Sequence, residues 1–135
     1  MGGRILSFIV VVATITGCGN LSLNSCNSLK ERAPAVMSTV RKTISKGSSY
    51  EQSIDILQER SLPKLDELIE LSTGCSYISD ESIRDEAVAI TSGLVHIQTM
   101  IARGTMGSPR NFDRKKERIM EAVQRAETAI EQLEL

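Results

Sequence analysis

Apolar side chains recur at steps of three and four residues along most of this chain, and that spacing constrains the fold more than any other feature. Steps of three or four return to the same side of an α-helix, whereas a strand needs strict alternation. Each run therefore predicts a helix with one apolar face. The clearest runs are Ile83, Ala87, Ile90, Leu94, Ile97 and Ile101, and Ile119, Val123, Ala126, Ile130 and Leu133.

Start and stop residues divide this periodic sequence into four predicted helices. Ser, Asp or a Ser-Pro pair can satisfy the free N–H groups of a helix start, and a left-handed Gly commonly ends a helix. The predicted starts are Ser28, Ser48, Ser79 or Asp80, and Ser108, and the predicted ends are Gly47, Gly74 and Gly104. Pro34 should kink the first helix or mark its true start, and Pro63 should kink or split the second.

The composition suits one small helical domain. Of the 135 residues, 41% are hydrophobic and only 3% are aromatic, so Leu, Ile, Val, Met and Ala must build the core. Short connections make neighbouring helices antiparallel. We therefore expect an all-α fold, an up-down-up-down antiparallel four-helix bundle. The same spacing permits a coiled coil with another chain, so a homo-oligomer remains possible. The net charge of −1 argues against a general nucleic-acid binder.

The first residues have the organisation of a secretory signal peptide. Arg4 supplies a positive charge, and an apolar stretch, Ile5–Ile15, follows it. This stretch is too short to cross a bilayer, which needs about 20 apolar residues. Residues 1–17 are therefore expected to direct export rather than to form part of the folded domain.

The end of this segment, Ile15-Thr16-Gly17-Cys18, resembles the lipobox of bacterial lipoproteins. The resemblance covers residues 1–18 only. It implies that Cys18 receives a diacylglycerol, that the peptide is cut before Cys18, and that the new amine is acylated. It also implies a cell-envelope protein facing the periplasm. Gly19, in place of an Asp, favours the outer membrane if the cell has one. The alternative is an uncleaved hydrophobic start with an ordinary Cys.

The mature chain is expected to have two parts. Asn20–Asn27 is small and polar, which is typical of a short tether, so residues 18–27 are assigned to a lipidated tether. The spacing of Ser28 and Glu31 is that of a capping box. The helical domain is therefore predicted to occupy residues 28–135.

Two cysteines remain besides Cys18, and we expect them to form a disulfide. Cys26 precedes the first predicted helix and Cys75 follows the second, so an antiparallel hairpin brings them to the same end. The compartment beyond the inner membrane is oxidising. Metal binding is the rival interpretation, but two cysteines and one distant His are too few ligands for a structural zinc site. No metal and no cofactor are expected.

No residue pattern indicates catalysis. His96 is the only His and lies in the middle of the third predicted helix, where a packed or edge position is more common than a catalytic one. No Ser or Cys has a recognisable partner pattern, and no Gly-rich loop suits a phosphate. Adjacent carboxylates such as Asp66 and Glu67 diverge around a helix and do not face one substrate. No catalytic residue is assigned, and an enzyme is the least favoured reading.

Charge is expected to separate along the bundle. The end near the lipid collects acids: Asp66, Glu67, Glu70, Asp80, Glu81, Asp85, Glu86, Glu127, Glu131 and Glu134. The far end collects bases: Arg41, Lys42, Lys46, Arg103, Arg110, Arg114, Lys115, Lys116 and Arg118. The fourth helix begins with bases, where its dipole favours acids, so stability alone does not explain them. The alternative is a solvated face balanced by neighbouring helices.

These observations favour a non-enzymatic binding or assembly factor anchored to the envelope membrane. Its basic end would contact an acidic protein or an anionic envelope polymer, as basic residues at an interface rim steer such encounters. The residues predicted to bind the partner are Arg103, Arg110, Arg114, Lys115, Lys116 and Arg118. A phage- or plasmid-type envelope lipoprotein, such as an exclusion or lysis factor, fits the same features.

Overall fold

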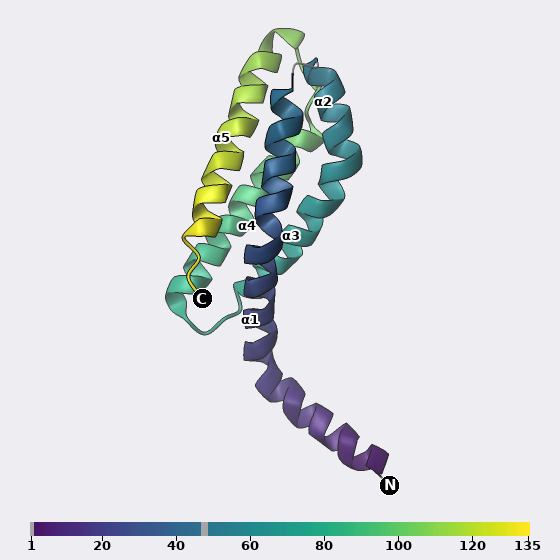
Figure 1. Ribbon diagram of the computed structural model, residues 1–135, viewed down its shortest axis with the longest axis vertical. Coiled ribbons are helices and arrows are strands. Elements are labelled where there is room, and N and C mark those ends of the chain that lie inside the picture. The colour runs from purple at the N-terminus through teal and green to yellow at the C-terminus, as the bar shows by residue number, and fades with distance from the viewer. Residues whose placement is uncertain (1, 47–48) are drawn as a thin grey trace.

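The computed structural model describes the backbone of residues 2–46 and 49–135 and the side chains of residues 21–46 and 49–135. These residues form four antiparallel rods (Figure 1). The first rod is α1 (Gly2–Ser45). The second contains α2 (Tyr50–Ile56), the π-helical turn η1 (Leu57–Ser61) and α3 (Leu62–Cys75). The third is α4 (Glu81–Ala102), and the fourth is α5 (Phe112–Glu131), which follows the 3-10 turn η2 (Pro109–Asn111).

The rods pack in a closed ring. α1 contacts α3 and α5, and α4 contacts α3 and α5. Successive rods run in opposite directions, which confirms the predicted all-α, up-down-up-down bundle (Figure 1). We call the end that holds the α4–α5 connection, residues 103–111, the distal end. The proximal end holds the α3–α4 connection, residues 76–80, and the last residues of the chain (Figure 1).

The first helix begins much earlier than Ser28, so that predicted start is wrong. α1 passes through residues 20–27 without a break, and the predicted tether is helical. The reason is that Ser22 and Cys26, both buried, continue the spacing of the buried face that Leu29 and Ala33 follow. Small polar side chains can occupy a buried helical face, and an apolar count overlooks them. Helical packing therefore begins before residue 28.

The two prolines are accommodated differently. Pro34 lies inside α1 with its ring on the exposed side, so it does not mark a helix start. Pro63 lies in the first turn of α3, directly after η1. In η1 the Leu62 N–H donates to Leu57 O, five residues back, and this wider turn precedes the proline that lacks an N–H. The second rod is therefore split by a π-helical turn, one of the two predicted outcomes.

Three helix starts carry side-chain caps, two of them at the predicted residues. Asp80 Oδ1 accepts from the Ile83 N–H at 3.2 Å, and Ser108 Oγ accepts from the Arg110 N–H at 3.4 Å. The second start is capped by Ser49, which accepts from the Gln52 N–H at 3.2 Å, one residue later than the predicted Ser48. Gly47 and Ser48 lie outside the described residues.

Gly74 and Gly104 do not end their helices as left-handed caps, contrary to the prediction, and Gly47 lies outside the described residues. Among the described residues, Gly107, with a φ of 94°, has the one positive φ, so neither Gly74 nor Gly104 is a left-handed cap. Both allow close packing instead. A Cβ on Gly74 would lie 2.8 Å from Ser25 Oγ, and a Cβ on Gly104 would lie 2.5 Å from Ile54 Cγ2.

The core is aliphatic, as the composition predicts, and runs from end to end of the bundle. Two pairs of polar groups lie inside it: the hydroxyls of Ser72 and Thr91 lie 2.7 Å apart between α3 and α4, and Ser53 Oγ donates to Thr43 O at 3.2 Å. The largest fully buried side chains are Leu29, Met37, Ile44, Ile54, Leu57, Leu65, Leu68, Ile90, Leu94, Ile97, Ile101 and Ile119.

Candidate functional site

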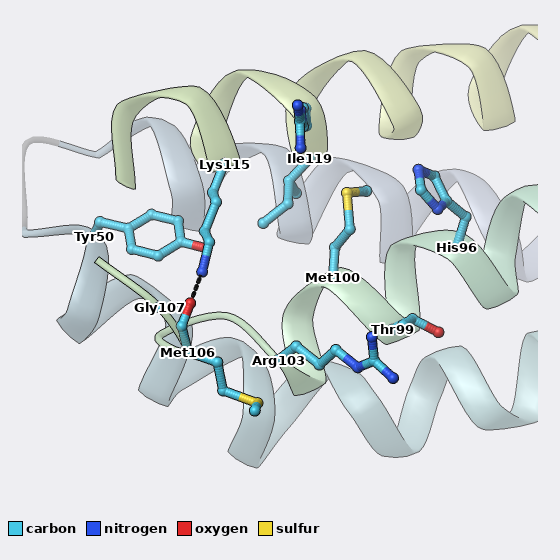
Figure 2. Close-up of a pocket in the computed structure, with 10 residues that line it drawn as sticks. Tyr50, His96, Thr99, Met100, Arg103, Met106, Gly107, Lys115 and Ile119 are labelled. Carbon is cyan, nitrogen blue, oxygen red and sulfur yellow. Dashed lines mark hydrogen bonds between the residues drawn. The ribbon is translucent and has the colours of Figure 1, made fainter. Parts of the chain in front are cut away.

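The described structure places a pocket of about 650 Å³ at the distal end, between α4 and α5 (Figure 2). One turn-spaced face of α4 and one of α5 form its two sides, and the α4–α5 loop and the start of α2 complete it. We call this the distal pocket. Its lining residues are Tyr50, His96, Thr99, Met100, Arg103, Met106, Gly107, Lys115, Arg118 and Ile119. Its volume lies in the range of small-molecule and side-chain binding sites.

The pocket combines an apolar floor with a cationic rim. Met100 and Ile119 face each other from α4 and α5, and Met106 comes from the loop with 67% of its surface exposed. A thioether side chain is flexible and adapts to different partners. The charged lining residues are Arg103, Lys115 and Arg118, and no acid is among the residues that line this pocket.

Half of the six predicted partner-binding residues meet at this pocket. Arg103, Lys115 and Arg118 line it, whereas Arg110, Arg114 and Lys116 lie outside it. The division follows from helical geometry, because steps of three and four from Lys115 reach Arg118 and Ile119 on one face of α5. Arg114 and Lys116, which flank Lys115 in sequence, point elsewhere around the helix. The basic cluster of the sequence is therefore not a single surface.

Lys115 has a structural task within its own chain. Its ammonium donates to Met106 O (Figure 2) and to Gly104 O at 3.4 Å, and lies 5.7 Å from the centre of the Phe112 ring. These contacts hold the loop against the start of α5. The Lys115 ammonium was predicted to bind a partner, but part of its hydrogen-bonding capacity is already used by the loop carbonyls.

Arg103 and Arg118 differ from Lys115 in this respect. Both side chains are exposed, and neither forms a hydrogen bond or an ion pair within the described part of the chain. A guanidinium presents donors in a rigid planar fork that matches a carboxylate in two parallel bonds. The pocket therefore offers two uncommitted sites for anionic groups beside an apolar floor.

Tyr50 closes the inner wall of the pocket. Its ring stacks on Phe112 with the centroids 4.9 Å apart, and its hydroxyl points toward the Lys115 side (Figure 2). The hydroxyl is buried and has no hydrogen-bond partner among the described residues. Burial raises the pKa of Tyr50 above its ordinary value of 10.0, so the phenol stays protonated at neutral pH.

Sequence analysis missed the non-basic lining of this site. His96 was assigned to a packed or edge position; it lies on the exposed edge of α4 and lines the pocket with Met100. The spacing of His96, Thr99, Met100 and Arg103 is that of a single helical face, and this signal could have pointed to the site. Tyr50 and Met106 gave no such signal because they reach the pocket only through the packing of α2 and the loop.

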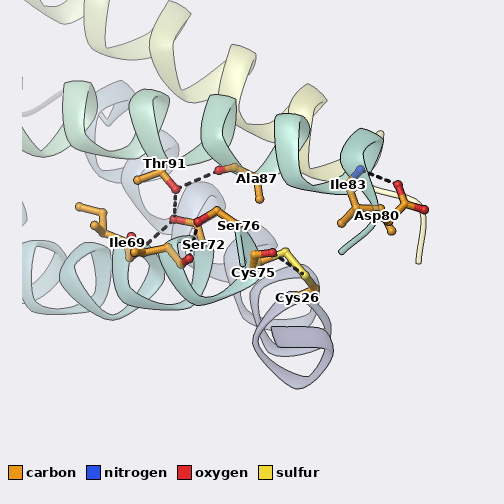
Figure 3. Close-up of a disulfide and its surroundings, with 10 residues drawn as sticks. Cys26, Ile69, Ser72, Cys75, Ser76, Asp80, Ile83, Ala87 and Thr91 are labelled. Atoms are coloured by element: carbon orange, nitrogen blue, oxygen red, sulfur yellow. Dashed lines mark hydrogen bonds between the residues drawn. A yellow bond between two sulfur atoms is a disulfide. The ribbon is translucent and has the colours of Figure 1, made fainter. Parts of the chain in front are cut away.

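At the proximal end, Cys26 and Cys75 form the predicted disulfide, with S–S 1.94 Å and Cα atoms 4.7 Å apart (Figure 3). The bond joins α1 to the last residue of α3, and both cysteines are fully buried. Gly74 permits this close approach, because its missing Cβ leaves room for Ser25 beside Cys26. Elsewhere in the described chain, no three His, Cys, Asp or Glu side chains gather as a metal site would require.

The predicted separation of charge is incomplete. Sequence analysis placed Arg41 and Glu127 at opposite ends, but the two side chains form a salt bridge between α1 and α5. This is the one salt bridge among the described side chains. Arg41 and Glu127 therefore do not belong to the opposite charged ends to which they were assigned.

The predicted lipidation residue, Cys18, lies outside the residues whose side chains are described, although its backbone is part of α1. Across the described residues, no helix combines the length and the apolar character needed to cross a membrane. Comparison with protein families, with curated proteins and with solved structures finds no match for this chain.

Proposed function

We propose that this protein is a bacterial lipoprotein, anchored through lipid on Cys18, that acts in the cell envelope as a non-enzymatic binding or assembly factor. Its working surface is the distal end, and its partner is an acidic protein or an anionic envelope polymer. The outer membrane is the favoured location if the cell has one. The observation that carries the proposal is the distal pocket, where uncommitted guanidinium groups surround an apolar floor without an opposing acid.

The arrangement of the two ends supports this function. α1 leads from the predicted anchor into the bundle at the proximal end, and the distal pocket lies at the other end (Figure 1). A disulfide joins α1 to α3 near the point where α1 enters the bundle, and such bonds persist in oxidising compartments. A protein held in this way would present its basic surface away from the anchoring bilayer.

The chemistry of the pocket favours binding over catalysis. Arg103 and Arg118 are permanently charged donors that suit the recognition of anions. Met100, Met106 and Ile119 supply apolar contact and cannot transfer protons. These groups explain affinity for an anionic partner without any chemical step.

The anchor is tested by intact-mass analysis of the membrane fraction. We expect an acylated chain that starts at Cys18, and we expect Cys18→Ser to leave the membrane. An unmodified thiol at position 18, or normal retention of the variant, would contradict the lipoprotein assignment.

The binding role is tested by cross-linking in intact envelopes, followed by purification of the protein with its partners. The parent is compared with the double variant Arg103→Gln/Arg118→Gln and with Arg84→Gln/Arg125→Gln, which removes the same charge from exposed positions outside the pocket. We expect the first variant alone to lose the partner. Equal recovery from all three proteins would contradict a role for the distal end.

A further inference from the structure

We propose that the distal pocket binds an acidic peptide segment of a partner protein, which inserts an apolar side chain between α4 and α5 and places carboxylates on Arg103 and Arg118. This inference rests on the proposed function and names the class of partner. The apolar floor, the uncommitted guanidinium groups and the open loop residue Met106 carry it together.

The apolar floor selects against a purely hydrophilic polymer. Met100 and Ile119 line the pocket from opposite helices, and Met106 adds a further apolar group that is 67% exposed. Ile119 is itself fully buried, but Met100 is half-buried and Met106 is largely exposed. A sugar or phosphate polymer has no apolar group to cover these two methionines, so it would leave them in water. A leucine-like side chain would cover them and gain the free energy of apolar burial.

The cationic rim indicates which charged groups the partner carries. Arg103 directly follows α4 as its C-cap residue, and Arg118 comes from the second turn of α5, so the two guanidinium groups come from different walls of the pocket. Each can hold one carboxylate through paired hydrogen bonds. A peptide with Glu residues on both sides of an apolar residue matches this arrangement, because one apolar group then lies between two carboxylates.

Position in the molecule favours a protein segment over an anionic lipid. The pocket is lined by the α4–α5 loop and the neighbouring parts of α4 and α5. That loop lies at the end of the bundle opposite to the one at which α1 enters (Figure 1). Lipid head groups of the anchoring bilayer would lie beyond the opposite end. The pocket is also walled by the Lys115-bound loop, which keeps the rim and the floor in one fixed arrangement. Such preorganisation reduces the cost of binding.

The test uses the mature acylated protein, which starts at Cys18, in nanodiscs of zwitterionic lipid, with isotope-labelled methionine methyl groups observed by NMR. The probe is the blocked peptide Glu-Leu-Glu-Glu-Leu-Glu. We expect the methyl signals of Met100 and Met106 to shift on titration. Met37, which is buried in the core on α1, is the internal control and should not move.

Two matched peptides and two matched variants complete the design. Replacement of both Leu by Ser, or of every Glu by Gln, should lower the affinity because each removes one half of the recognition. Arg103→Gln/Arg118→Gln should weaken binding at least about tenfold, which is the effect of losing one charge-assisted interaction. Arg84→Gln/Arg125→Gln, with the same net charge, should bind as the parent does.

Several results would overturn the inference. No shift at Met100 and Met106 would exclude the pocket as the peptide site. If the Leu-to-Ser peptide binds as tightly as the original peptide, the pocket holds anions without using its apolar floor. If both double variants weaken binding equally, only the overall charge of the protein matters. Shifts in nanodiscs of anionic lipid without peptide would assign the pocket to lipid. Each result leaves the lipid anchor, measured by mass, unaffected, so failure here differs from failure of the proposed function.

Discussion

Gly93 lies inside α4 and Gly104 follows its end, and the two glycines have different surroundings. A Cβ on Gly104 would meet Ile54 Cγ2 at 2.5 Å, whereas a Cβ on Gly93, inside α4, would meet nothing within 4 Å. Gly104 is required by packing of the distal loop on α2. Gly93 has open space where a Cβ would lie, so packing does not require glycine there, and glycine in a helix interior carries an entropic cost.

We therefore expect opposite effects from two alanine substitutions. Gly93→Ala should raise the free energy of unfolding by about 0.5–1 kcal/mol. Gly104→Ala should lower it by roughly 1–3 kcal/mol, because Ile54 is fully buried and cannot move aside freely. Urea unfolding of the two variants measures both. A shift of both midpoints in the same direction would contradict this account.

Tyr50 provides a pH-dependent test of the inner wall of the distal pocket. Because burial raises its pKa above 10.0, the folded state holds the phenolic proton more tightly than the unfolded state does. The contribution of this group to stability is therefore present below pH 10 and is lost as the pH rises through the folded-state pKa.

The chain has two tyrosines, so Tyr77→Phe leaves Tyr50 as the only one. Its ultraviolet titration in the folded protein should have a midpoint above 10.0. Tyr50→Phe keeps an aromatic ring that can stack on Phe112 but removes the phenolic proton. Its free energy of unfolding should therefore not show the decrease at high pH that ionisation of Tyr50 causes in the parent. A midpoint at or below the ordinary value would show that the phenol is not buried as described.

At the scale of elements, the start of α5 mixes two kinds of basic residue. Arg114 is exposed and forms no hydrogen bond or ion pair with another described residue that would explain its charge at the positive pole of a helix, whereas Lys115 bonds to the carbonyls of the preceding loop. Arg114→Glu should therefore raise stability by about 0.3–1 kcal/mol. Lys115→Glu should lower it, by an amount on the order of 1 kcal/mol, because the loop loses its donor.

Thermal unfolding followed by circular dichroism distinguishes the two α5 variants. Equal stabilisation by Arg114→Glu and Lys115→Glu would mean that Lys115 is only part of a solvated face. This difference also matters for binding studies, since a variant that replaces Lys115 changes the loop as well as the charge.

The disulfide connects two elements that are far apart in sequence, with a separation of 49 residues. Closing a loop of this length limits the unfolded chain and contributes roughly 4 kcal/mol in the chain-entropy model. The double variant Cys26→Ser/Cys75→Ser should have a free energy of unfolding that is lower by about that amount. Its denaturant midpoint should therefore be lower than that of the parent. Reduction of the parent should give a similar loss, and an unchanged midpoint in both cases would show that the bond has no stabilising role.

At the scale of the whole molecule, one aliphatic core extends from the disulfide to the distal pocket. Gly74 and Gly104 allow close packing at its opposite ends. We expect Gly74→Ala and Gly104→Ala to lower the same single unfolding transition, because both act on one cooperative unit. Calorimetry of the two variants measures this. Two separate transitions, with each variant affecting a different one, would show that the ends unfold independently.

Much of the fold was predictable from the sequence because helical signals are local. The periodic apolar faces of α4 and α5, the caps at Asp80 and Ser108, and the order of four antiparallel rods all depend on residues a few positions apart. The cysteine pairing was predictable as well, since it follows from the antiparallel order. The helical character of residues 20–27 was missed because Ser22 and Cys26 do not look apolar in sequence, although the bundle buries them.

What the sequence by itself determined is therefore the helices, their order and the presence of a basic cluster. Tertiary structure alone decided which members of that cluster act together. Arg103 and Arg118 are 15 positions apart in the sequence and line one pocket. Lys115 instead donates a hydrogen bond to the α4–α5 loop, and Arg41 forms a salt bridge with Glu127. The physical reason is that a side chain's partners depend on helix rotation and on the approach of distant elements. The periodicity of apolar residues limits helix rotation and the approach of distant elements, but it does not determine them.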